Sequence, residues 1–469
     1  MLRTSRTLRR TLATAAAHAQ PAPTPQPVPS AAAGGASISS ELRSLKSSLT
    51  HLLGSSHPSL DAVAKYYFQA EGKNLRPMIV LLMSQATNGL GGAGWDRMQR
   101  KEERERAAGR SGMDESLTSV EGVLNDWNPD QMGMEGERDM VFAEPYLVGA
   151  GRQQRQATTT ISESTSASPT DNASPPPPPP PPPPALLSTQ RRLASITEMI
   201  HVASLLHDDV IDNSPLRRGS PSAPAQFSNK LSILAGDFLL GRASVALARL
   251  GSREVVELLA TVVANLVEGE VMQMRASPTG TSASPSAEAF EIYMRKTYLK
   301  TASLMAKSAR ASVILGGCGA HDEQEVTARM SASEVAEGER IKDIAYAYGR
   351  NLGIAFQLID DLLDFLPPSP TLGKPSLGAD LSLGLTTAPV LYAWLSNPAL
   401  GPLIARKYAH KGDVVEAREL VARSDGLERT RELAQKFADE ARRSVEQLPE
   451  GEARESLIGL TRTVINRVA

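Results

Sequence analysis

The chain has 469 residues and carries 50 Lys and Arg against 52 Asp and Glu, a formal net charge of −2. Because the charges nearly balance, no global field favours nucleic acid or an anionic membrane, and we expect no nucleic-acid partner. The single cysteine, Cys318, excludes an intrachain disulfide and a cysteine-built metal site, and its small neighbours in LGGCGA predict a packed residue. No uninterrupted apolar run approaches the ~20 residues that a membrane-spanning helix needs.

Residues 1–38 predict a leader that lies outside the folded domain. Arginines recur at helical intervals among Ser, Thr, Leu and Ala, at Arg3, Arg6, Arg9 and Arg10, and the first acidic residue is Glu41. That composition is typical of a mitochondrial transit peptide, here followed by a Pro-rich stretch. We therefore expect a mitochondrial protein, in the matrix or at the periphery of the inner membrane. A disordered basic tail is the alternative.

Residues 39–88 predict the first helices of a folded domain, including the apolar run from Met78 to Met83. Residues 89–185 are rich in Gly, charge, Ser and Thr, and they close with ten prolines from Pro175 to Pro184. We expect this stretch to be a disordered insertion that ends in a polyproline II rod. The rod could dock an SH3- or WW-type partner, but we favour an inert spacer.

Helical periodicity resumes at Leu186 and continues through residues 186–469. The predicted helices are Thr189–Ile211, Asn229–Leu250, Glu254–Arg275, Ala287–Leu315, Glu337–Phe365, Thr387–Trp394, Asp413–Arg423, Leu427–Gln447 and Ala453–Val468. A looser segment, residues 277–286, is expected to be a loop between two of them. Since neither β alternation nor a repeat is present, the sequence predicts one large all-α domain.

Two aspartate clusters stand in apolar sequence with helical spacing. They are Asp208, Asp209 and Asp212 in LLHDDVIDN, and Asp360, Asp361 and Asp364 in FQLIDDLLDF. Residues four apart share one helix face, so the first and last members of each cluster point the same way. Stacked carboxylates repel each other and resist burial, and a cation relieves both costs. The clusters therefore predict two helices that hold Mg²⁺ between them, with a phosphorylated ligand completing its coordination.

Basic and amide side chains accompany the two clusters along the chain. The candidates are Lys73, Arg76, Arg217, Arg218, Lys300 with Thr301, Gln357 and Lys374. Arginine binds phosphate oxygens in pairs through its planar donors, and lysine adds a mobile point charge. Two carboxylate clusters with several basic groups fit two diphosphates, one held through metal ions and the other held directly by Lys and Arg.

Six motifs now stand in order along the chain: GKNLRP, DDVIDNSPLRRG, GDFLL, KTA, FQLIDDLLD and GKPSLGADLSLG. In these motifs the chain resembles the trans-polyprenyl diphosphate synthases of the all-α isoprenoid synthase family, and most of all the mitochondrial long-chain members that make the ubiquinone side chain. The resemblance covers about residues 39–88 and 186–469 and leaves out the insertion. It implies a helical bundle with the active site in a central cavity, and Mg²⁺ as the cofactor. It also implies two substrates, isopentenyl diphosphate and an allylic diphosphate such as farnesyl or geranylgeranyl diphosphate.

The resemblance also assigns roles to single residues. It implies that Mg²⁺ is bound by Asp208, Asp212 and Asp360, with Asp209, Asp361 and Asp364 as direct or supporting ligands. The allylic diphosphate would contact Arg217, Lys300, Thr301, Gln357 and Lys374, and isopentenyl diphosphate would contact Lys73, Arg76, His201 and Arg218. The implied catalytic set is Asp208, Asp212, Asp360, Lys300 and Arg217. His207 has no such role and is expected to be structural.

The implied reaction needs no protein nucleophile. The allylic diphosphate ionises, isopentenyl diphosphate attacks the cation through its double bond, and the departing pyrophosphate takes the proton. The protein's part is to orient the two substrates and to exclude water from the cation.

Two residues that precede the first aspartate cluster bear on the length of the product. Ala203 and Ser204 lie five and four residues before Asp208. In the family a bulky aromatic side chain there blocks the growing tail early. Both residues are small in this chain, so the resemblance implies a product of six to ten isoprene units. Close helix packing is a compatible structural explanation of the small residues.

Other functions fit less well. A terpene cyclase needs one diphosphate and usually replaces the second aspartate motif. A short-chain farnesyl or geranylgeranyl diphosphate synthase is disfavoured by Ala203 and the Arg-rich leader. A non-catalytic subunit of a heteromeric synthase would be expected to have lost part of the metal and cation sets. From the resemblance we expect a homodimer or a hetero-oligomer, and a lipid product is compatible with peripheral membrane contact.

Overall fold

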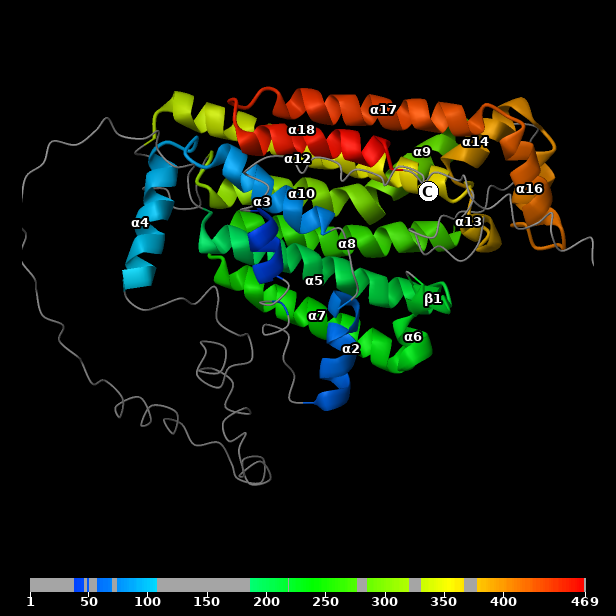
Figure 1. The fold of residues 1–469 in the computed structure, drawn as a ribbon, viewed down its shortest axis with the longest axis horizontal. Coiled ribbons are helices and arrows are strands. Elements are labelled where there is room, and N and C mark those ends of the chain that lie inside the picture. Colours follow the sequence, from blue (N-terminus) through cyan, green and yellow to red (C-terminus); the bar gives the residue numbers. More distant parts are fainter. Residues whose placement is uncertain are drawn as a thin grey trace, which may run out of the picture.

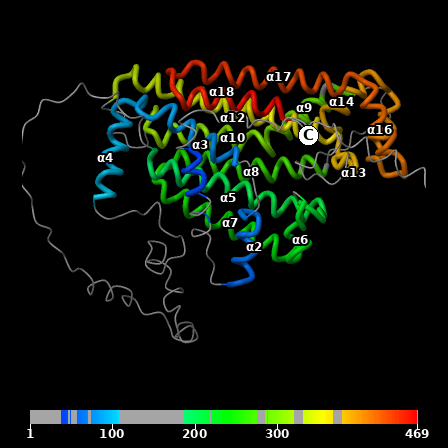
Figure 2. The backbone as a smooth tube through the Cα atoms, viewed as in Figure 1, coloured from blue at the N-terminus to red at the C-terminus, as the bar shows by residue number. Residues whose placement is uncertain are grey.

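The computed structural model describes residues 38–45, 49, 57–69, 74–107, 186–217, 219–275, 285–319, 330–366 and 378–467. They form a helical bundle in which the long helices run side by side (Figure 1), as the backbone trace also shows (Figure 2). The prediction of an all-α fold is confirmed. The helices are α2 (Pro58–Gln69), α3 (Leu75–Thr87), α4 (Ala93–Ala107), α5 (Ser188–Ile211), α6 (Ala223–Gln226), α7 (Asn229–Arg249), α8 (Arg253–Arg275), α9 (Ala287–Thr297), η4 (Tyr298–Ala302), α10 (Ser303–Leu315), α12 (Ala332–Leu363), α13 (Ala379–Ser382), α14 (Ala388–Ser396), α15 (Leu400–Ala405), α16 (Asp413–Ala422), α17 (Gly426–Val445) and α18 (Glu452–Ile465).

A small antiparallel hairpin follows α5, and within the described residues it is the only sheet. Strand β1 (Leu216–Arg217) pairs with β2 (Ser220–Pro221), so that Arg217 lies opposite Ser220. The hairpin folds the chain back beneath the end of α5. It therefore brings an arginine to the aspartates that precede it in sequence.

The longest helix, α12, lies at the centre of the bundle, against α10 and α17. Two glycines let its backbone come close to the neighbouring helices. A Cβ atom at Gly349 would lie 2.5 Å from the Met305 carbonyl oxygen, and one at Gly353 would lie 2.6 Å from Ala302 Cα. Because both contacts are with backbone atoms, larger residues would push α12 away from η4 and α10.

Side-chain contacts show that α5 and α10 are antiparallel. Near the start of α5, Gln190 Nε2 donates to the Ser312 carbonyl oxygen at 3.1 Å. Further along α5, Thr197 Oγ1 donates to Ser308 Oγ at 3.0 Å. The end of α5 therefore lies beside the start of α10, which is also where α12 passes η4 on the way to its own end. Both aspartate clusters thus belong to the same end of the bundle (Figure 1).

The segment predicted as a single helix from Ala287 to Leu315 is helical throughout, but it contains one turn of π-helix, η4. A π-turn adds a residue to the local repeat and is frequent at functional sites. It carries Lys300 and Thr301, two of the predicted ligands of the allylic diphosphate. A Cβ atom at Gly269 of α8 would lie 2.6 Å from Lys300 Cγ, so this glycine lets η4 pack against α8.

The predicted start of α12 was late by five residues. The helix begins at Ala332 and not at Glu337, because Ser331 and Glu334 form a capping box. Ser331 Oγ accepts from the Glu334 backbone N–H at 3.2 Å, and Glu334 Oε2 accepts from the Ser331 N–H at 2.8 Å. The serine and glutamate spacing of this motif is visible in the sequence.

The prediction that disorder begins at residue 89 was wrong for α4, which spans Ala93–Ala107. Trp95 is buried, and Glu102 accepts a hydrogen bond from the Ser188 backbone N–H at 2.9 Å. A charged sequence is therefore ordered here by docking on the start of α5. The rest of the predicted insertion, with its prolines, and almost all of the predicted leader lie outside the described residues.

One described helix, α7, is long and apolar enough by length and composition to cross a membrane. Buried helices of water-soluble cores pass the same criterion, and 39% of the apolar window in α7 is buried in the protein. Cys318 is also buried, in agreement with the prediction of a packed residue.

Candidate active site

Both aspartate clusters lie at the C-terminal ends of long helices. Asp208 and Asp209 are in the last turn of α5, and Asp212 follows its last residue. Asp360 and Asp361 are in the last turn of α12, and Asp364 follows it. Helix C-termini carry partial negative charge, so carboxylates are disfavoured there and cations are attracted. The sequence thus builds a region of concentrated negative charge that metal ions or basic side chains stabilise.

In the first cluster, the central carboxylate is held by the protein. Asp209 is fully buried and accepts from Arg217 Nε at 2.8 Å and from Arg217 Nη2 at 2.7 Å. Tyr67 on α2 donates its hydroxyl to Asp209 and accepts from the Ala223 N–H at 2.8 Å. Burial alone would lower the pKa of Arg217, but its hydrogen bond to Asp209 and the Asp209 charge raise it. Asp209 thus anchors the hairpin, α2 and α6 to the end of α5.

The other two members of this cluster are in a different environment. The pKa of Asp208 is raised to about 6, chiefly by burial; the Lys300 charge opposes this shift, and the charges of Glu270 and Asp212 add to it. Burial also raises the pKa of Asp212, again with Lys300 opposing it. Lys300 itself forms an ion pair with Glu270 of α8. The charges of Lys300 and Arg217 therefore oppose the effect of burial on both aspartates, but the pKa of each stays raised.

In the second cluster, neutral donors hold the central carboxylate. Asp361 is buried and accepts from the Tyr293 hydroxyl at 2.6 Å and from Gln357 Nε2 at 2.7 Å. Burial raises its pKa to about 6, although both hydrogen bonds oppose the shift. Asp364 is also buried and accepts from the backbone N–H groups of Ala379 and Asp380 at 3.2 and 3.1 Å. It therefore caps the start of α13.

Asp360 occupies the rim of the second cluster. Its side chain is 34% exposed, and Arg467 Nη2 lies 3.8 Å from its Oδ1. That distance is an ion-pair contact and too long for a hydrogen bond. The Arg467 guanidinium also stacks on Phe356, 4.5 Å from the ring centroid. A residue near the C-terminal end of the chain thus reaches the aspartates of α12.

The π-turn η4 connects the two clusters. The Lys300 charge lowers the pKa of Asp208 and Asp212 in the first cluster, whereas the neighbouring Thr301 donates to Gln357 Oε1 at 2.7 Å. Gln357 in turn holds Asp361 of the second cluster. Two predicted diphosphate ligands on adjacent residues therefore stand between the acidic ends of two helices.

The predicted ligands of the second diphosphate that the structure describes lie together. Arg76 Nη1 on α3 is 3.0 Å from His201 Nε2 on α5. His201 and Arg217 line a cavity of about 240 Å³, whose wall also includes Tyr66, Tyr67 and Glu198. Lys73, Arg218 and Lys374 lie outside the described residues.

The two predicted chain-length residues lie on α5, about one turn before the first cluster. Ala203 is completely buried in the core, and Ser204 is partly buried with its hydroxyl donating to the His201 carbonyl oxygen at 2.8 Å. His207 packs over Gly236 of α7, where a Cβ atom would clash with the imidazole. This contact explains why the glycine of GDFLL adjoins the aspartate helix.

Comparison with known proteins identifies the chain. Residues 145–421 match the family described as polyprenyl synthetase. The chain belongs to this family. It is 45% identical over 432 residues to a probable hexaprenyl pyrophosphate synthase, mitochondrial, of Neurospora crassa, a match that covers 92% of the chain and 80% of that protein. It is 37% identical over 430 residues to decaprenyl-diphosphate synthase subunit 1 of Schizosaccharomyces pombe, with 92% and 90% covered.

A solved polyprenyl synthase has the same fold. The structure from Caulobacter crescentus, described as a complex with calcium and isoprenyl diphosphate, is 26% identical with a TM-score of 0.61, and the match covers 92% of this chain and 97% of that one. The chain is thus a prenyltransferase of the polyprenyl synthetase family, as its motifs predict.

In this family member, sequence reasoning missed four residues at the site. Tyr67 and Tyr293 hold the central aspartates, Glu270 pairs with Lys300, and Arg467 approaches Asp360. Glu270 is an acidic residue that the structure buries within the amphipathic helix α8. Tyr67 and Tyr293 lie a few residues before GKNLRP and KTA but outside both motifs, and Arg467 is far from all of them.

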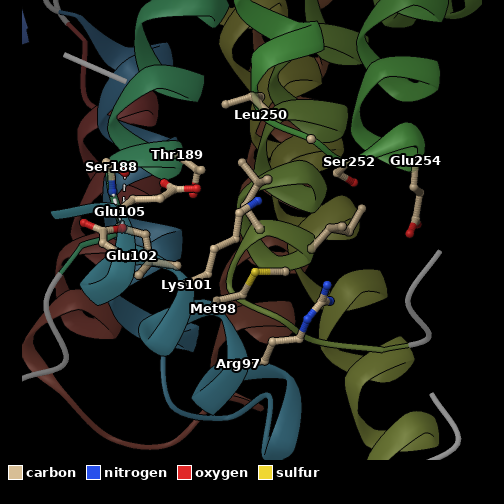
Figure 3. Close-up of a pocket in the computed structure, with 14 residues that line it drawn as sticks. Arg97, Met98, Lys101, Glu102, Glu105, Ser188, Thr189, Leu250, Ser252 and Glu254 are labelled. Carbon is tan, nitrogen blue, oxygen red and sulfur yellow. Dashed lines mark hydrogen bonds between the residues drawn. The ribbon is translucent and has the colours of Figure 1, made fainter. Parts of the chain in front are cut away.

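Another pocket lies at the opposite end of the bundle and is remote from the aspartates. It has a volume of about 70 Å³ and lies between α4 and the start of α5, with Lys101, Glu102 and Ser188 around it (Figure 3). Ser188 and Asp208 are both in α5, and at 1.5 Å per residue they lie about 30 Å apart. Within the described residues, no group of three or more His, Cys, Asp or Glu side chains is arranged to hold a metal ion unaided.

Proposed function

We propose that the chain is a mitochondrial long-chain trans-polyprenyl diphosphate synthase. It would condense isopentenyl diphosphate head to tail (1′-4) onto an allylic diphosphate, farnesyl or geranylgeranyl diphosphate, to supply the ubiquinone side chain. The observation that carries the proposal is the pair of acidic helix ends joined by η4. Relatives named hexaprenyl and decaprenyl synthases support the long-chain class.

The donor set fits Mg²⁺. Carboxylate oxygens are the ligands that this ion prefers, and it usually combines one or two of them with substrate phosphate oxygens. Burial raises the pKa of Asp208 and Asp361 to about 6, which reflects negative charge that a divalent cation would stabilise. We assign Asp208, Asp212 and Asp360 to the metal ions. When bound, the ions would neutralise the diphosphate and favour its departure.

The remaining aspartates support these ligands. Asp209 is engaged by Arg217 and Tyr67, Asp361 by Tyr293 and Gln357, and Asp364 by the start of α13. Hydrogen bonds of this kind orient a helix end and hold its other carboxylates in place. We therefore assign Arg217 first to positioning Asp209. The exposed edge of the Arg217 guanidinium would face the substrate.

The basic residues orient the two substrates. Lys300 and Thr301 lie where the allylic diphosphate would meet the metal ions, with Gln357 behind them. Arg76 and His201 lie together on α3 and α5, where they would bind isopentenyl diphosphate with Lys73 and Arg218. Holding both diphosphates fixes the double bond against the allylic carbon, and this orientation is the chain's main contribution to the rate. The departing pyrophosphate is the expected proton acceptor.

The assay that tests this function is direct. The purified protein is incubated with Mg²⁺, farnesyl diphosphate and labelled isopentenyl diphosphate, and the extracted lipids are sized. Chains of six to ten isoprene units, the range of the relatives' names, support the proposal. Products that stop at farnesyl or geranylgeranyl length indicate a short-chain synthase. Absence of incorporation by the pure protein indicates an obligate partner subunit.

Ala203 offers a test of where the product lies. Since this residue is buried on α5 above Asp208, Ala203→Phe should place an aromatic ring across the path of the tail and shorten the product. Ser204→Ala, which changes no bulk, is the matched control. An unchanged product distribution in a folded Ala203→Phe variant would mean that the tail follows another route.

We propose a homodimer or hetero-oligomer, and one of the relatives is named as a subunit. Exposed apolar side chains on α7 and α8, among them Leu234, Val267 and Met274, support a helix–helix interface there. Light scattering of the purified protein tests the assembly, and a monodisperse monomer would contradict it.

A further inference from the structure

Glu270 has no role in the motifs, yet it lies inside the site. It is 8% exposed, on the face of α8 that packs against η4, and it accepts the ion pair from Lys300. The residue before it, Gly269, provides the space into which the Lys300 stem fits. The helix α8 thus supplies both the cradle for the aliphatic stem and the counter-ion for the ammonium group.

Lys300 has other carboxylates within reach of its charge. The Lys300 charge lowers the pKa of both Asp208 and Asp212, and the Lys300 side chain is only 20% exposed. A lysine ammonium is a compact charge on a flexible stem and can turn toward any of the three carboxylates. The structure shows Glu270 as its partner, because Gly269 and the π-turn place the stem directly against α8.

We propose that Glu270 is a positioning residue that holds Lys300 away from Asp208 and Asp212, so that these carboxylates stay open to divalent cations while the ammonium faces the diphosphate. The inference rests on the proposed function, since it takes these two aspartates as metal ligands. In the absence of Glu270, Lys300 turns to Asp208 or Asp212 and competes with the metal ion for their oxygens. Removal of a carboxylate that is not itself a metal ligand then weakens metal binding through the lysine.

A double-mutant cycle tests the inference. Calorimetry measures the binding of inorganic pyrophosphate at stepped Mg²⁺ concentrations for wild type, Glu270→Gln, Lys300→Met and the double variant. Glu270→Gln should raise the Mg²⁺ concentration for half-maximal binding about tenfold, a typical coupling between contacting groups. In the Lys300→Met background the same substitution should change it less than about twofold.

Equal effects of Glu270→Gln in both backgrounds would overturn the inference, since Glu270 would then act as a charge or a metal ligand in its own right. No effect in either background would also overturn it. Glu268→Gln removes an exposed charge from the same helix and is the matched control for bulk electrostatics. Thermal unfolding and circular dichroism show that each variant is folded, and Glu270→Asp, which keeps the charge, should restore part of the wild-type metal dependence.

The result of this experiment can be distinguished from the result of the assay that tests the proposed function. Failure of the wild type to elongate farnesyl diphosphate would contradict the function, whereas the pyrophosphate isotherms still report on Lys300 and Glu270. If the wild type elongates farnesyl diphosphate normally but the effects of the Glu270 and Lys300 substitutions are additive, the proposed function is supported and the proposed role of Glu270 is contradicted.

Discussion

The two aspartate clusters share a sequence pattern, but the protein treats their central members differently. Asp209 in the first cluster is neutralised by the guanidinium of Arg217, whereas Asp361 in the second is held by a tyrosine hydroxyl and a glutamine amide. A charged partner keeps a buried carboxylate ionised, while neutral partners leave much of the burial cost in place. The same five-residue pattern therefore builds one helix end anchored by an ion pair and one whose central aspartate is held by neutral hydrogen-bond donors, with the Lys296 charge nearby.

The third members differ as well. Asp212 remains beside Lys300 and Asp208, whereas Asp364 caps the four-residue helix α13. The first cluster thus directs two carboxylates toward the proposed metal site, and the second directs one, Asp360. The symmetry of the motif therefore does not extend to the roles of its residues.

The largest expected effect is on turnover. Asp208→Ala and Asp360→Ala should each lower the rate of isopentenyl diphosphate incorporation by about 10³-fold, the scale on which a lost electrostatic group acts at a reacting centre. The fold should survive, because removal of either charge relieves repulsion at a helix end. Near-normal turnover in either variant would contradict the assignment of that carboxylate to a metal ion.

The next effect is on the free energy of unfolding, which should respond differently to substitution of the two central aspartates. In chelator at pH 7.5, Asp209→Asn should cost about 3 kcal/mol, since it leaves the buried side of Arg217 without its counter-ion. Asp361→Asn should change the free energy of unfolding by less than about 1 kcal/mol, because a lost neutral hydrogen bond is offset by removal of a buried charge. Thermal or urea unfolding measures both. Similar losses in the two variants would remove the proposed difference between the clusters.

A smaller effect depends on pH. Because the pKa of Asp208 is raised to about 6 from its ordinary 3.8, the folded protein binds this proton more tightly than the unfolded chain. Stability is therefore lost as pH rises through that range. In chelator, Asp208→Asn should be more stable than wild type by about 2 kcal/mol at pH 7.5, and the two should converge near pH 4.

Thermal unfolding of the two proteins across this pH range checks the prediction. Glu268→Gln, at an exposed position of α8, is the control that should show no such convergence. A constant difference between wild type and Asp208→Asn at all pH values would show that the burial of Asp208 does not govern the effect.

Much of this arrangement could be predicted from local pattern. Helical spacing located α5 and α12, and it placed Asp208 with Asp212 on one face. The serine and glutamate spacing of the capping box at Ser331 is also visible in the sequence. The different partners of the aspartates within each cluster could not be predicted, because Asp209 is held by Tyr67 from an earlier helix and by Arg217 only once the hairpin folds back.

The π-turn is a second feature that the local sequence pattern does not predict. YLKTA has ordinary helical propensity, and its π-turn packs against Gly269 of α8 and Gly353 of α12. Those glycines are ordinary small residues in the sequence, and only the assembled bundle shows that they let η4 approach. The partner of Lys300 could therefore be found only in three dimensions.

We propose that the opposed acidic helix ends bind metal ions through some of their carboxylates, while the other carboxylates are held by the protein's own side chains and backbone. A crystal structure with Mg²⁺ and a non-hydrolysable farnesyl diphosphate analogue tests it most directly. We predict metal contacts to Asp208, Asp212 and Asp360, with Asp209 still on Arg217 and Asp361 still on Tyr293. Metal ions bound to Asp209 after Arg217 has moved away, or a diphosphate bound elsewhere with both clusters facing solvent, would contradict it.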